Sequence, residues 1–457
     1  MTRKSAGFVD REFELKSLEG ICRKPGPGFV VVYGRRRVGK TELIKEFSKG
    51  KELIYFLADK RGTESNVQRL ASLAAWHFND TEPAAKGIED VFEYIKKRAG
   101  KSKRVVVAID EFPNLVEKDS SIPSVFQLIV DEIMPGTRIL LLISGSSMSM
   151  MERLLGGKSP LYGRRTAHYR LEPLKIWDAW KFYPKYGIED AIKAYSVTGG
   201  IPYYCSLFSQ EKSVPENIRD VVLSKDGRLY EEAEFLLKEE LREPSAYEGI
   251  LEAMSTGLAA PTNIADYAGM NAKDASFYLR TLVNLRVVRK EVSLEDKRKK
   301  KGLYFIEDNF FRFWFRYAKP NMSRLEAGDI PVVMASVEKG MEEYVSRHVF
   351  EQVCKDFLSR KAPFSPQEIG RWWEKGREID IVAFDRETRQ ILFAECKWKD
   401  GVDAGRVLEE LKEKSAHVKW KQGKRQEHFA VFAKSFSKKA EGALLFDLKD
   451  LEKAFRD

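Results

Sequence analysis

The chain has 457 residues, of which 43% are hydrophobic and 32% charged, a globular composition that excludes a disordered or fibrous protein and accommodates about three or four domains. No apolar run is nearly long enough to span a membrane. No apolar run follows Met1 to Asp10 as it would in a signal peptide. Four unpaired-looking cysteines and five histidines also exclude a disulfide framework and a Cys/His zinc site, so we expect a cytoplasmic protein that holds any metal through carboxylates. The formal net charge of +10 hints at a polyanionic partner.

Three short apolar runs in the first third of the chain predict buried strands. They are separated by helical stretches and end in polar residues, and they cover Phe29 to Tyr33, Val105 to Ile109 and Ile139 to Ile143. An amphipathic helix is expected from about Lys40 to Phe47. This alternation predicts an α/β fold with a doubly wound parallel sheet, whose ligand groups lie at the carboxyl ends of the strands.

A phosphate-binding motif follows the first of these strands and opens the helix. Gly34 to Thr41 fits G-x-x-x-x-G-K-[ST]. Gly34 and Gly39 let the backbone curl, so that successive N–H groups face a β-phosphate. Lys40 supplies a charge to the β- and γ-phosphates, and Thr41 offers a hydroxyl to Mg²⁺. The motif therefore predicts ATP binding with Mg²⁺.

Polar residues at the ends of the other two strands complete the predicted nucleotide site. Asp110 is expected to hold Mg²⁺ through its water shell, and Glu111 to polarise the attacking water. Ser144 is expected near the γ-phosphate as a polar sensor. The alternatives are a strand that ends in solvated acids and a serine that only caps the next helix.

Helical segments dominate the middle of the chain. A helical lid is predicted from Trp177 to Leu241, broken at Gly199 to Pro202. Three further amphipathic segments and a hairpin predict a winged helix-turn-helix module, and they cover Tyr247 to Thr256, Pro261 to Tyr267, Asn271 to Leu285, and the strands Val287 to Val292 and Leu303 to Ile306. The aromatic segment Phe310 to Tyr317 is expected to pack between modules.

Nucleic acid, DNA in particular, is the partner that this module predicts. The third segment is the expected recognition helix, with Lys273, Ser276, Tyr278 and Arg280 facing outward. The hairpin tip carries five consecutive bases, Lys297 to Lys301, each able to neutralise a phosphate. Two alternatives stay open, because a basic surface run can be merely solvated and winged helices also serve as spacers between proteins.

A carboxylate cluster is predicted near the end of the chain. A helix around Met341 to Leu358 precedes two strands, Glu378 to Phe384 and Ile391 to Trp398, and a helix to about Trp420 and a strand from His428 to Ala433 follow. A hairpin turn centred between Glu387 and Thr388 places Asp380 opposite Glu395, with Lys397 on the same face as Glu395. Two acids for Mg²⁺ and a lysine beside water suit phosphodiester hydrolysis. The alternative is a strand pair with ordinary surface acids.

Several motifs in the first half of the chain resemble the archaeal ATPase family, a branch of AAA+-like and STAND-like NTPases. They are Phe8 to Glu12 with Leu15, the phosphate loop, Ile109 to Glu111, Ser144 to Ser146, Leu161 to Arg164, and Gly199 to Pro202. The resemblance implies that the segment with Arg11 packs on the adenine and assigns Arg11 to cofactor binding. It also implies that Arg164 reaches the γ-phosphate. A solvated basic turn at Arg164 and Arg165 is the alternative.

The last quarter of the chain resembles the restriction-endonuclease-like, or PD-(D/E)xK, nuclease fold. The resemblance rests on Ile369 to Trp373, Glu378 to Asp380 and Glu395 to Trp398, with Ile379 where the full motif has proline. It implies a further acid from the preceding helix, for which Glu351 is preferred and Glu343 is the runner-up. A degenerate relative that does not cut is an open alternative.

Together these patterns predict four domains. They are a P-loop ATPase core (1–173), a helical lid (174–243), a winged helix-turn-helix (244–318) and a restriction-endonuclease-like domain (332–457). The predicted function is ATP hydrolysis coupled to a nucleic-acid-binding winged helix and a Mg²⁺-dependent nuclease domain. The alternative is a nucleotide-controlled switch or scaffold with a non-cutting C-terminal domain. An arginine acting in trans would add a homo-oligomer.

Overall fold

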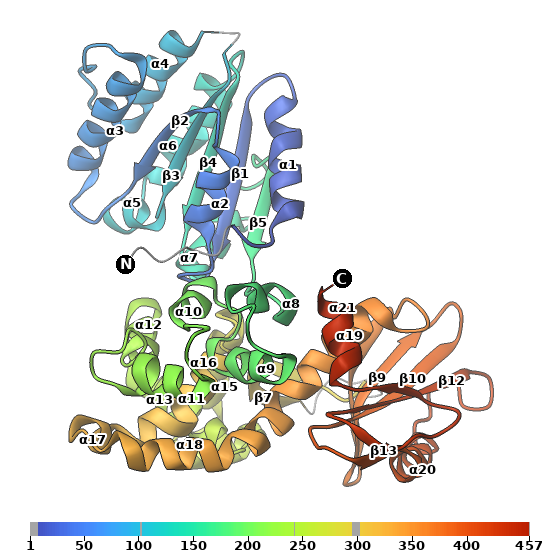
Figure 1. Cartoon of the computed structure of the whole chain (residues 1–457). Helices are drawn as coiled ribbons and strands as arrows, with labels where there is room; N and C mark the ends of the chain where they lie inside the picture. The colour runs from blue at the N-terminus through green and yellow to red at the C-terminus, as the bar shows by residue number, and fades with distance from the viewer. Residues whose placement is uncertain (1–7, 101–102, 242, 295–301, 457) are drawn as a thin grey trace. The chain divides into compact units, whose positions relative to one another are not determined.

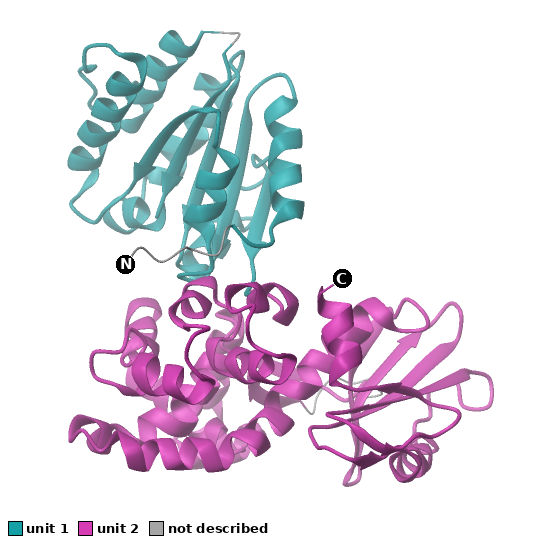
Figure 2. Cartoon of the chain, in the orientation of Figure 1, with its two compact units in different colours: residues 1–173 teal, residues 174–457 magenta. Residues whose placement is uncertain are grey.

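The chain divides into two compact units in a computed structural model, Met1–Pro173 and Leu174–Asp457 (Figures 1 and 2). The structure describes residues 8–100, 103–241, 243–294 and 302–456. Cys22, Cys205, Cys354 and Cys396 are free thiols. Within the described ranges, no helix is both long and apolar enough to cross a membrane.

Unit 1 is built around a five-stranded parallel sheet in the order β2-β3-β4-β1-β5. Its strands are β1 (Gly28–Gly34), β2 (Glu52–Leu57), β3 (Val105–Asp110), β4 (Ile139–Gly145) and β5 (Ala167–Leu171). Strands β1, β3 and β4 are buried at every position, since other elements cover both faces of the sheet. They confirm the three predicted strands, whereas β2 and β5 are additional.

Helices pack on both faces of this sheet. They are α1 (Glu12–Arg23), α2 (Lys40–Phe47), α3 (Thr63–Phe78), α4 (Ile88–Ala99), α5 (Pro113–Lys118), α6 (Ile122–Leu128), the π-helical η1 (Ile129–Ile133) and α7 (Met148–Leu155). On one face, Leu18 of α1 and Leu43 of α2 share a core with Val32 of β1. Phe92 of α4 and Phe126 of α6 form an edge-on ring pair elsewhere in the core. The predicted helix from Lys40 to Phe47 is confirmed.

Unit 2 begins with short helices that are interrupted where the sequence predicts a break. They are α8 (Ile176–Ala179), η2 (Trp180–Phe182), α9 (Ile188–Thr198), α10 (Pro202–Leu207), α11 (Val214–Ile218), η3 (Arg219–Leu223) and α12 (Glu232–Glu240). A Cβ atom on Gly200, whose φ is +70°, would lie 2.0 Å from the carbonyl oxygen of Leu174. Only glycine fits this turn, which ends α9 and lets Pro202 start α10.

Three helices and an antiparallel hairpin follow, as predicted. They are α13 (Pro244–Ser255), α14 (Pro261–Tyr267), α15 (Ala272–Asn284), β6 (Val288–Glu291) and β7 (Leu303–Ile306). The basic run 297–301 lies outside the described residues. The next elements are α16 (Asn309–Phe313), η4 (Trp314–Ala318), η5 (Lys319–Asn321), α17 (Met322–Glu326), α18 (Ile330–Val345) and η6 (Ser346–Phe350). Phe310, Phe313 and Trp314 are fully buried. The packing of this segment between modules stays a prediction.

A mixed five-stranded sheet forms the rest of unit 2, in the order β14-β12-β10-β9-β8. The elements are α19 (Glu351–Lys361), β8 (Glu368–Glu374), β9 (Arg377–Asp385), β10 (Gln390–Lys397), β11 (Val402–Asp403), α20 (Ala404–Ser415), β12 (Gln426–Ala433), β13 (Phe436–Lys438), β14 (Leu444–Phe446) and α21 (Leu448–Arg456). The helix predicted to reach Trp420 ends at Ser415, which corrects that boundary. The indole of Trp420 instead stacks on Phe384 at 4.8 Å, so its apolar signal comes from packing after the helix has ended.

Candidate nucleotide site and C-terminal carboxylates

The phosphate loop curls between β1 and α2. Gly39 has a φ of +100°, and a Cβ atom on Gly34 would lie 2.6 Å from the carbonyl oxygen of Leu171, so both positions need glycine. The Lys40 side chain is 5% exposed, and its Nζ donates to the carbonyl oxygens of Gly34 at 2.9 Å and Arg35 at 3.2 Å. The ammonium group is thereby held over the loop at the N-terminus of α2, where anions bind favourably.

Asp110 connects the loop with two neighbouring strands. Its Oδ2 accepts hydrogen bonds of 2.6 Å from the hydroxyl groups of Thr41 and Tyr55, and its Oδ1 accepts one from Ser144. Burial works to raise the pKa of Asp110, but the bonds from Ser144, Thr41 and Tyr55, with the charge of Lys40, hold that pKa below its usual value. Thr41, Asp110 and Ser144 are thus brought together, as the sequence motifs predict.

Glu111 adopts an uncommon backbone conformation next to Asp110. Its φ is +53°, in the left-handed region that non-glycine residues rarely occupy. Its carboxylate accepts hydrogen bonds from the backbone N–H of Ser146 at 3.2 Å and from the Ser146 hydroxyl at 2.8 Å. Strained residues of this kind concentrate at functional sites. Ser146 belongs to the motif Ser144 to Ser146, which does not by itself indicate a role for it, and Tyr55 could not be expected here because strand β2 was not predicted.

The two arginines assigned by family resemblance have partners of their own within unit 1. Arg11 has a φ of +76°, and its guanidinium donates to the carbonyl oxygen of Glu172 at 2.5 Å. The Nε of Arg164 donates to the carboxylate of Asp131 in η1 at 2.8 Å, and its Nη1 donates to the carbonyl oxygen of Pro160. The described contacts of Arg164 therefore hold it at Asp131 and not at the phosphate loop.

In unit 2, the register between β9 and β10 agrees with the predicted hairpin. Ile381 pairs with Ala394, so Asp380 and Glu395 continue the same register by one step. The Asp380 carboxylate accepts a hydrogen bond of 2.8 Å from the backbone N–H of Cys396. Glu395 is 2% exposed and accepts one bond from Lys397 at 2.6 Å and another from Lys414 of α20 at 2.8 Å. Lys414, 19 residues further along the chain, was not predicted.

The further acids predicted from the preceding helix also pair with basic groups. Glu351, the first residue of α19, lies 3.5 Å from the guanidinium of Arg371. Burial raises the pKa of Glu351, with Arg371 opposing that shift and Asp380 adding to it. The runner-up, Glu343, pairs with Arg347 on the surface. Among the described residues, no three Asp, Glu, His or Cys side chains gather closely enough to hold a metal ion, so Glu351, Asp380 and Glu395 do not form a single three-carboxylate site in this arrangement.

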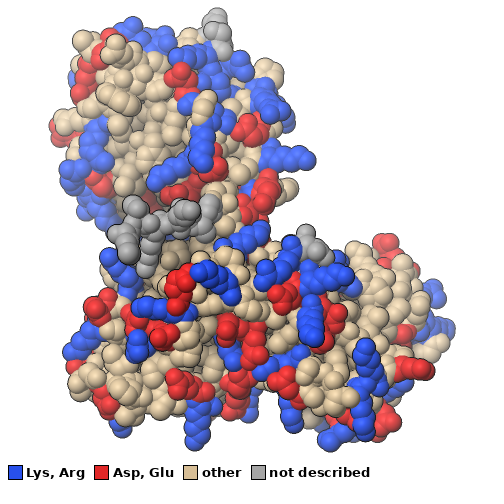
Figure 3. Space-filling view, in the orientation of Figure 1, with Lys and Arg blue, Asp and Glu red and all other residues tan. Residues whose placement is uncertain are grey.

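The predicted recognition helix presents a mixed surface. Lys273, Ser276 and Arg280 on α15 are exposed, whereas the Tyr278 hydroxyl donates to Glu243 at 2.8 Å. Phe277, which was not among the predicted outward residues of this helix, is 61% exposed. Basic and acidic side chains are interspersed on the face of each unit that Figure 3 shows. The excess of positive charge therefore does not form one continuous patch on that face.

Comparison with known proteins relates the first part of the chain to ATPases. Residues 8–208 match a family described as an ATPase domain predominantly from Archaea, and residues 314–428 match a family of archaeal and bacterial proteins of unknown function. An uncharacterized protein of Methanocaldococcus jannaschii is 36% identical over 455 residues, 97% of this chain and 99% of that protein. A Walker-type ATPase of Pyrococcus abyssi has a similar fold, with a TM-score of 0.52, 20% identity, and coverage of 68% of this chain and 96% of that one. The chain therefore belongs to the family of archaeal P-loop ATPases.

Proposed function

We propose that the chain binds ATP with Mg²⁺ at the phosphate loop, hydrolyses it, and uses the nucleotide state to control a nucleic-acid-binding second unit. The observation that carries the proposal is the Asp110 carboxylate, which accepts hydrogen bonds from Thr41 of the loop and Ser144 of β4. These groups meet at the carboxyl ends of parallel strands, where α/β sheets bind their ligands.

The residues of unit 1 divide the work of hydrolysis. Lys40 and the N-terminus of α2 bind the β- and γ-phosphates, because both present positive charge to the same point. Thr41 and Asp110 offer a hydroxyl and a carboxylate oxygen, donor types that fit Mg²⁺. When bound, this ion neutralises charge on the phosphate oxygens. Glu111, oriented by Ser146, accepts the proton of the attacking water.

Replacing Glu111 tests the hydrolytic part. Glu111→Gln should bind ATP normally but release phosphate about 100-fold more slowly, because the amide cannot take the proton. Glu117→Gln is the matched control, since Glu117 is a nearby exposed acid on α5 that pairs with Lys60 at 2.9 Å. Single-turnover phosphate release and binding of a fluorescent ATP analogue give the two readouts. Wild-type turnover in Glu111→Gln would contradict the assignment.

Nucleic-acid binding is assigned to the three helices and hairpin of residues 244–318, read as a winged helix-turn-helix. The exposed bases Lys273 and Arg280 on α15 support it. The double variant Lys273→Ala/Arg280→Ala should weaken binding of a DNA duplex about tenfold, because two phosphate contacts are lost. The control removes two exposed bases from one face of α21 (Lys449→Ala/Lys453→Ala). Equal losses in both double variants would indicate unspecific attraction only.

A Mg²⁺-dependent nuclease in the 332–457 domain is the second candidate. The register that sets Asp380 opposite Glu395 favours it. The lysine partners of Glu395 favour the non-cutting switch instead, because they already neutralise the acid. Plasmid and branched DNA should be incubated with Mg²⁺ and either wild type or Asp380→Ala. Cleavage by the wild type alone supports the nuclease, and equal results in both proteins remove it.

Homo-oligomerisation is a further part of the proposal. Arg164 is paired with Asp131 of its own chain. An arginine supplied by a second copy of the chain would therefore be the group that reaches the γ-phosphate and completes the site. Light scattering with and without ATP should then show a mass increase on ATP addition. A monomer under both conditions would contradict the proposal that a second copy supplies an arginine.

A further inference from the structure

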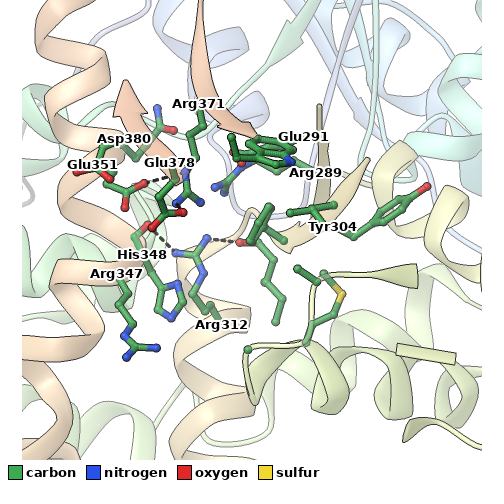
Figure 4. A pocket seen from close by; sticks show the side chains of 18 of the residues that line it. Arg289, Glu291, Tyr304, Arg312, Arg347, His348, Glu351, Arg371, Glu378 and Asp380 are labelled. Atoms are coloured by element: carbon green, nitrogen blue, oxygen red, sulfur yellow. Dashed lines mark hydrogen bonds and ion pairs between the residues drawn. The ribbon is translucent and has the colours of Figure 1, made fainter. Parts of the chain in front are cut away.

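A cavity of about 730 Å³ lies within unit 2, between the β6–β7 hairpin and the strands β8 and β9 (Figure 4). Arg289 and Phe305 line it from the hairpin, and Glu351 and Asp380 line it from the opposite side. Its volume lies within the range of about 300 to 1,000 Å³ that is typical of small-molecule sites. A site of this size accommodates one or two nucleotides but not a double helix.

Basic side chains outnumber acidic ones around this cavity, seven to four. Arg312 is 6% exposed, and its guanidinium donates to the Asn309 side chain and to the carbonyl oxygens of Ile306 and His348. In the part of the chain that the structure describes, neither Arg312 nor Lys355 forms an ion pair with a carboxylate. Burial lowers the pKa of Arg312 to about 10 and also lowers that of Lys355. An anion in the cavity would stabilise both desolvated cations.

Aromatic rings accompany these cations. Phe305 of β7 and Trp373 of β8 both line the cavity. The guanidinium groups of Arg289 and Arg371 lie 5.4 Å and 5.8 Å from the centre of the Phe305 ring. Cations together with aromatic rings on which bases stack are the two components of sites for single-stranded nucleic acid.

The described residues that follow β6 contact strand β8. The backbone N–H of Leu294 donates to the carbonyl oxygen of Arg371 at 3.3 Å, and that of Trp373 donates to the Ser293 hydroxyl at 3.1 Å. The chain that leaves β6 therefore lies along β8, the edge strand of the C-terminal sheet. A Cβ atom on Gly370 would lie only 3.3 Å from the Leu294 side chain, which shows how closely the two segments approach. These contacts join β6 to β8 next to Arg371 and Trp373, two residues that line the cavity.

We propose that this cavity binds a single-stranded end of a nucleic acid and excludes uninterrupted duplex. The inference rests on the proposed nucleic-acid function of unit 2 and adds the form of the ligand. The phosphates of the strand lie at Arg312 and Lys355, and its bases stack on Trp373 and on the guanidinium groups that pack against Phe305. Asp380 and Glu351 then stand beside the strand end, whether or not the domain cuts it.

Alternate residues of β6 provide a matched pair of variants. Among the described residues, Arg289 lines the cavity and the adjacent Lys290 does not, and the Lys290 ammonium lies 5.8 Å from the ring centre of its cross-strand partner Tyr304. Arg289→Ala and Lys290→Ala each remove one positive charge from the same strand. Lys355→Ala on α19 tests the opposite wall, with Lys361→Ala, an exposed lysine on the same helix, as its control.

Fluorescence anisotropy on the full chain in EDTA, where Mg²⁺-dependent cleavage is prevented, measures binding alone. The probes are a labelled oligothymidylate of about 12 nucleotides and a labelled dumbbell duplex without free ends. The single strand should bind about tenfold more tightly than the dumbbell, and Arg289→Ala and Lys355→Ala should each weaken it about fivefold. Lys290→Ala and Lys361→Ala should change its affinity less than about twofold.

Three other results would overturn the inference. Tighter binding of the dumbbell would leave the proposed nucleic-acid function standing and remove the single-strand preference. Equal losses in Arg289→Ala and Lys290→Ala would place the strand outside the cavity. Binding of neither probe would remove the nucleic-acid function of unit 2 together with this inference, while ATP hydrolysis in unit 1 would be judged separately by Glu111→Gln.

Discussion

Asp110 in unit 1 and Glu395 in unit 2 are both 2% exposed, but their partners have opposite character. Asp110 accepts hydrogen bonds from the hydroxyl groups of Thr41, Tyr55 and Ser144. Glu395 accepts them from the ammonium groups of Lys397 and Lys414. Hydroxyl groups orient a carboxylate without neutralising it, whereas two ammonium groups more than cancel its charge. The first acid is therefore suited to attract a cation, and the second already has cations of its own.

Loss of the phosphate-loop lysine should give the largest effect on this comparison. Lys40→Ala removes the ammonium group held over the loop, and ATP binding should weaken about 100-fold or more. Lys45→Ala is the control, because Lys45 is an exposed residue of the same helix, paired with Glu42 at 3.2 Å. Isothermal titration calorimetry with ATP and Mg²⁺ measures both. Unchanged ATP hydrolysis in Lys40→Ala would mean that the phosphate loop has been misread.

A Mg²⁺ titration sharpens the comparison between the two acids. In ADP-saturated protein, Mg²⁺ at about 100 times its Kd should stabilise unit 1 by about 2.7 kcal/mol. Asp110→Asn should lose that Mg²⁺-dependent stabilisation, and Asp380→Asn, which changes the acid beside Glu395, should retain it. Thermal unfolding at several Mg²⁺ concentrations provides the measurement. The reverse pattern would assign the ion to unit 2.

The central part of unit 1 could be predicted from sequence because its strands are buried on both faces. Continuous apolar runs reveal β1, β3 and β4. The two missed strands, β2 and β5, lie at the edges of the sheet, where partial exposure interrupts the apolar pattern. Missing β2 also meant missing Tyr55, one of the three hydroxyl donors to Asp110.

Contacts that depend on docking of distant elements could not be predicted in the same way. The hairpin register of Asp380 and Glu395 follows from turn position, which is local, and it was predicted. The bond from Lys414 to Glu395 depends on where α20 packs against the sheet, and no local pattern records that. The pairing of Arg371 with Glu351 likewise joins β8 to α19. These two contacts are the ones that change the interpretation of the carboxylates.

Removing the charge of Glu395 should destabilise unit 2. Glu395→Gln leaves Lys397 and Lys414 close together without their shared counter-ion, and we expect a loss of about 1 to 3 kcal/mol in the free energy of unfolding. Glu410→Gln on α20 is the control, because Glu410 pairs with the exposed Arg406 at 3.1 Å and should change stability by less than about 1 kcal/mol. Urea unfolding followed by circular dichroism measures the difference. Equal stability of Glu395→Gln and wild type would mean that the lysines do not depend on Glu395.

The smallest effect is expected for Tyr55→Phe, which removes one of the three hydroxyl donors to Asp110 and leaves the ring in place. We expect a loss of about 1 kcal/mol in stability, since Thr41 and Ser144 still satisfy the carboxylate. Tyr94→Phe is the matched control, because the Tyr94 hydroxyl also donates to a carboxylate, that of Asp80, at 2.9 Å, and Asp80 is less buried than Asp110. Equal losses of stability in Tyr94→Phe and Tyr55→Phe would show that the burial of Asp110 does not strengthen the contribution of the Tyr55 hydrogen bond. A larger loss in Tyr55→Phe, together with weaker Mg²⁺-dependent ADP binding, would indicate that the hydroxyl groups keep Asp110 ionised and oriented for a cation, which is the property that distinguishes it from Glu395.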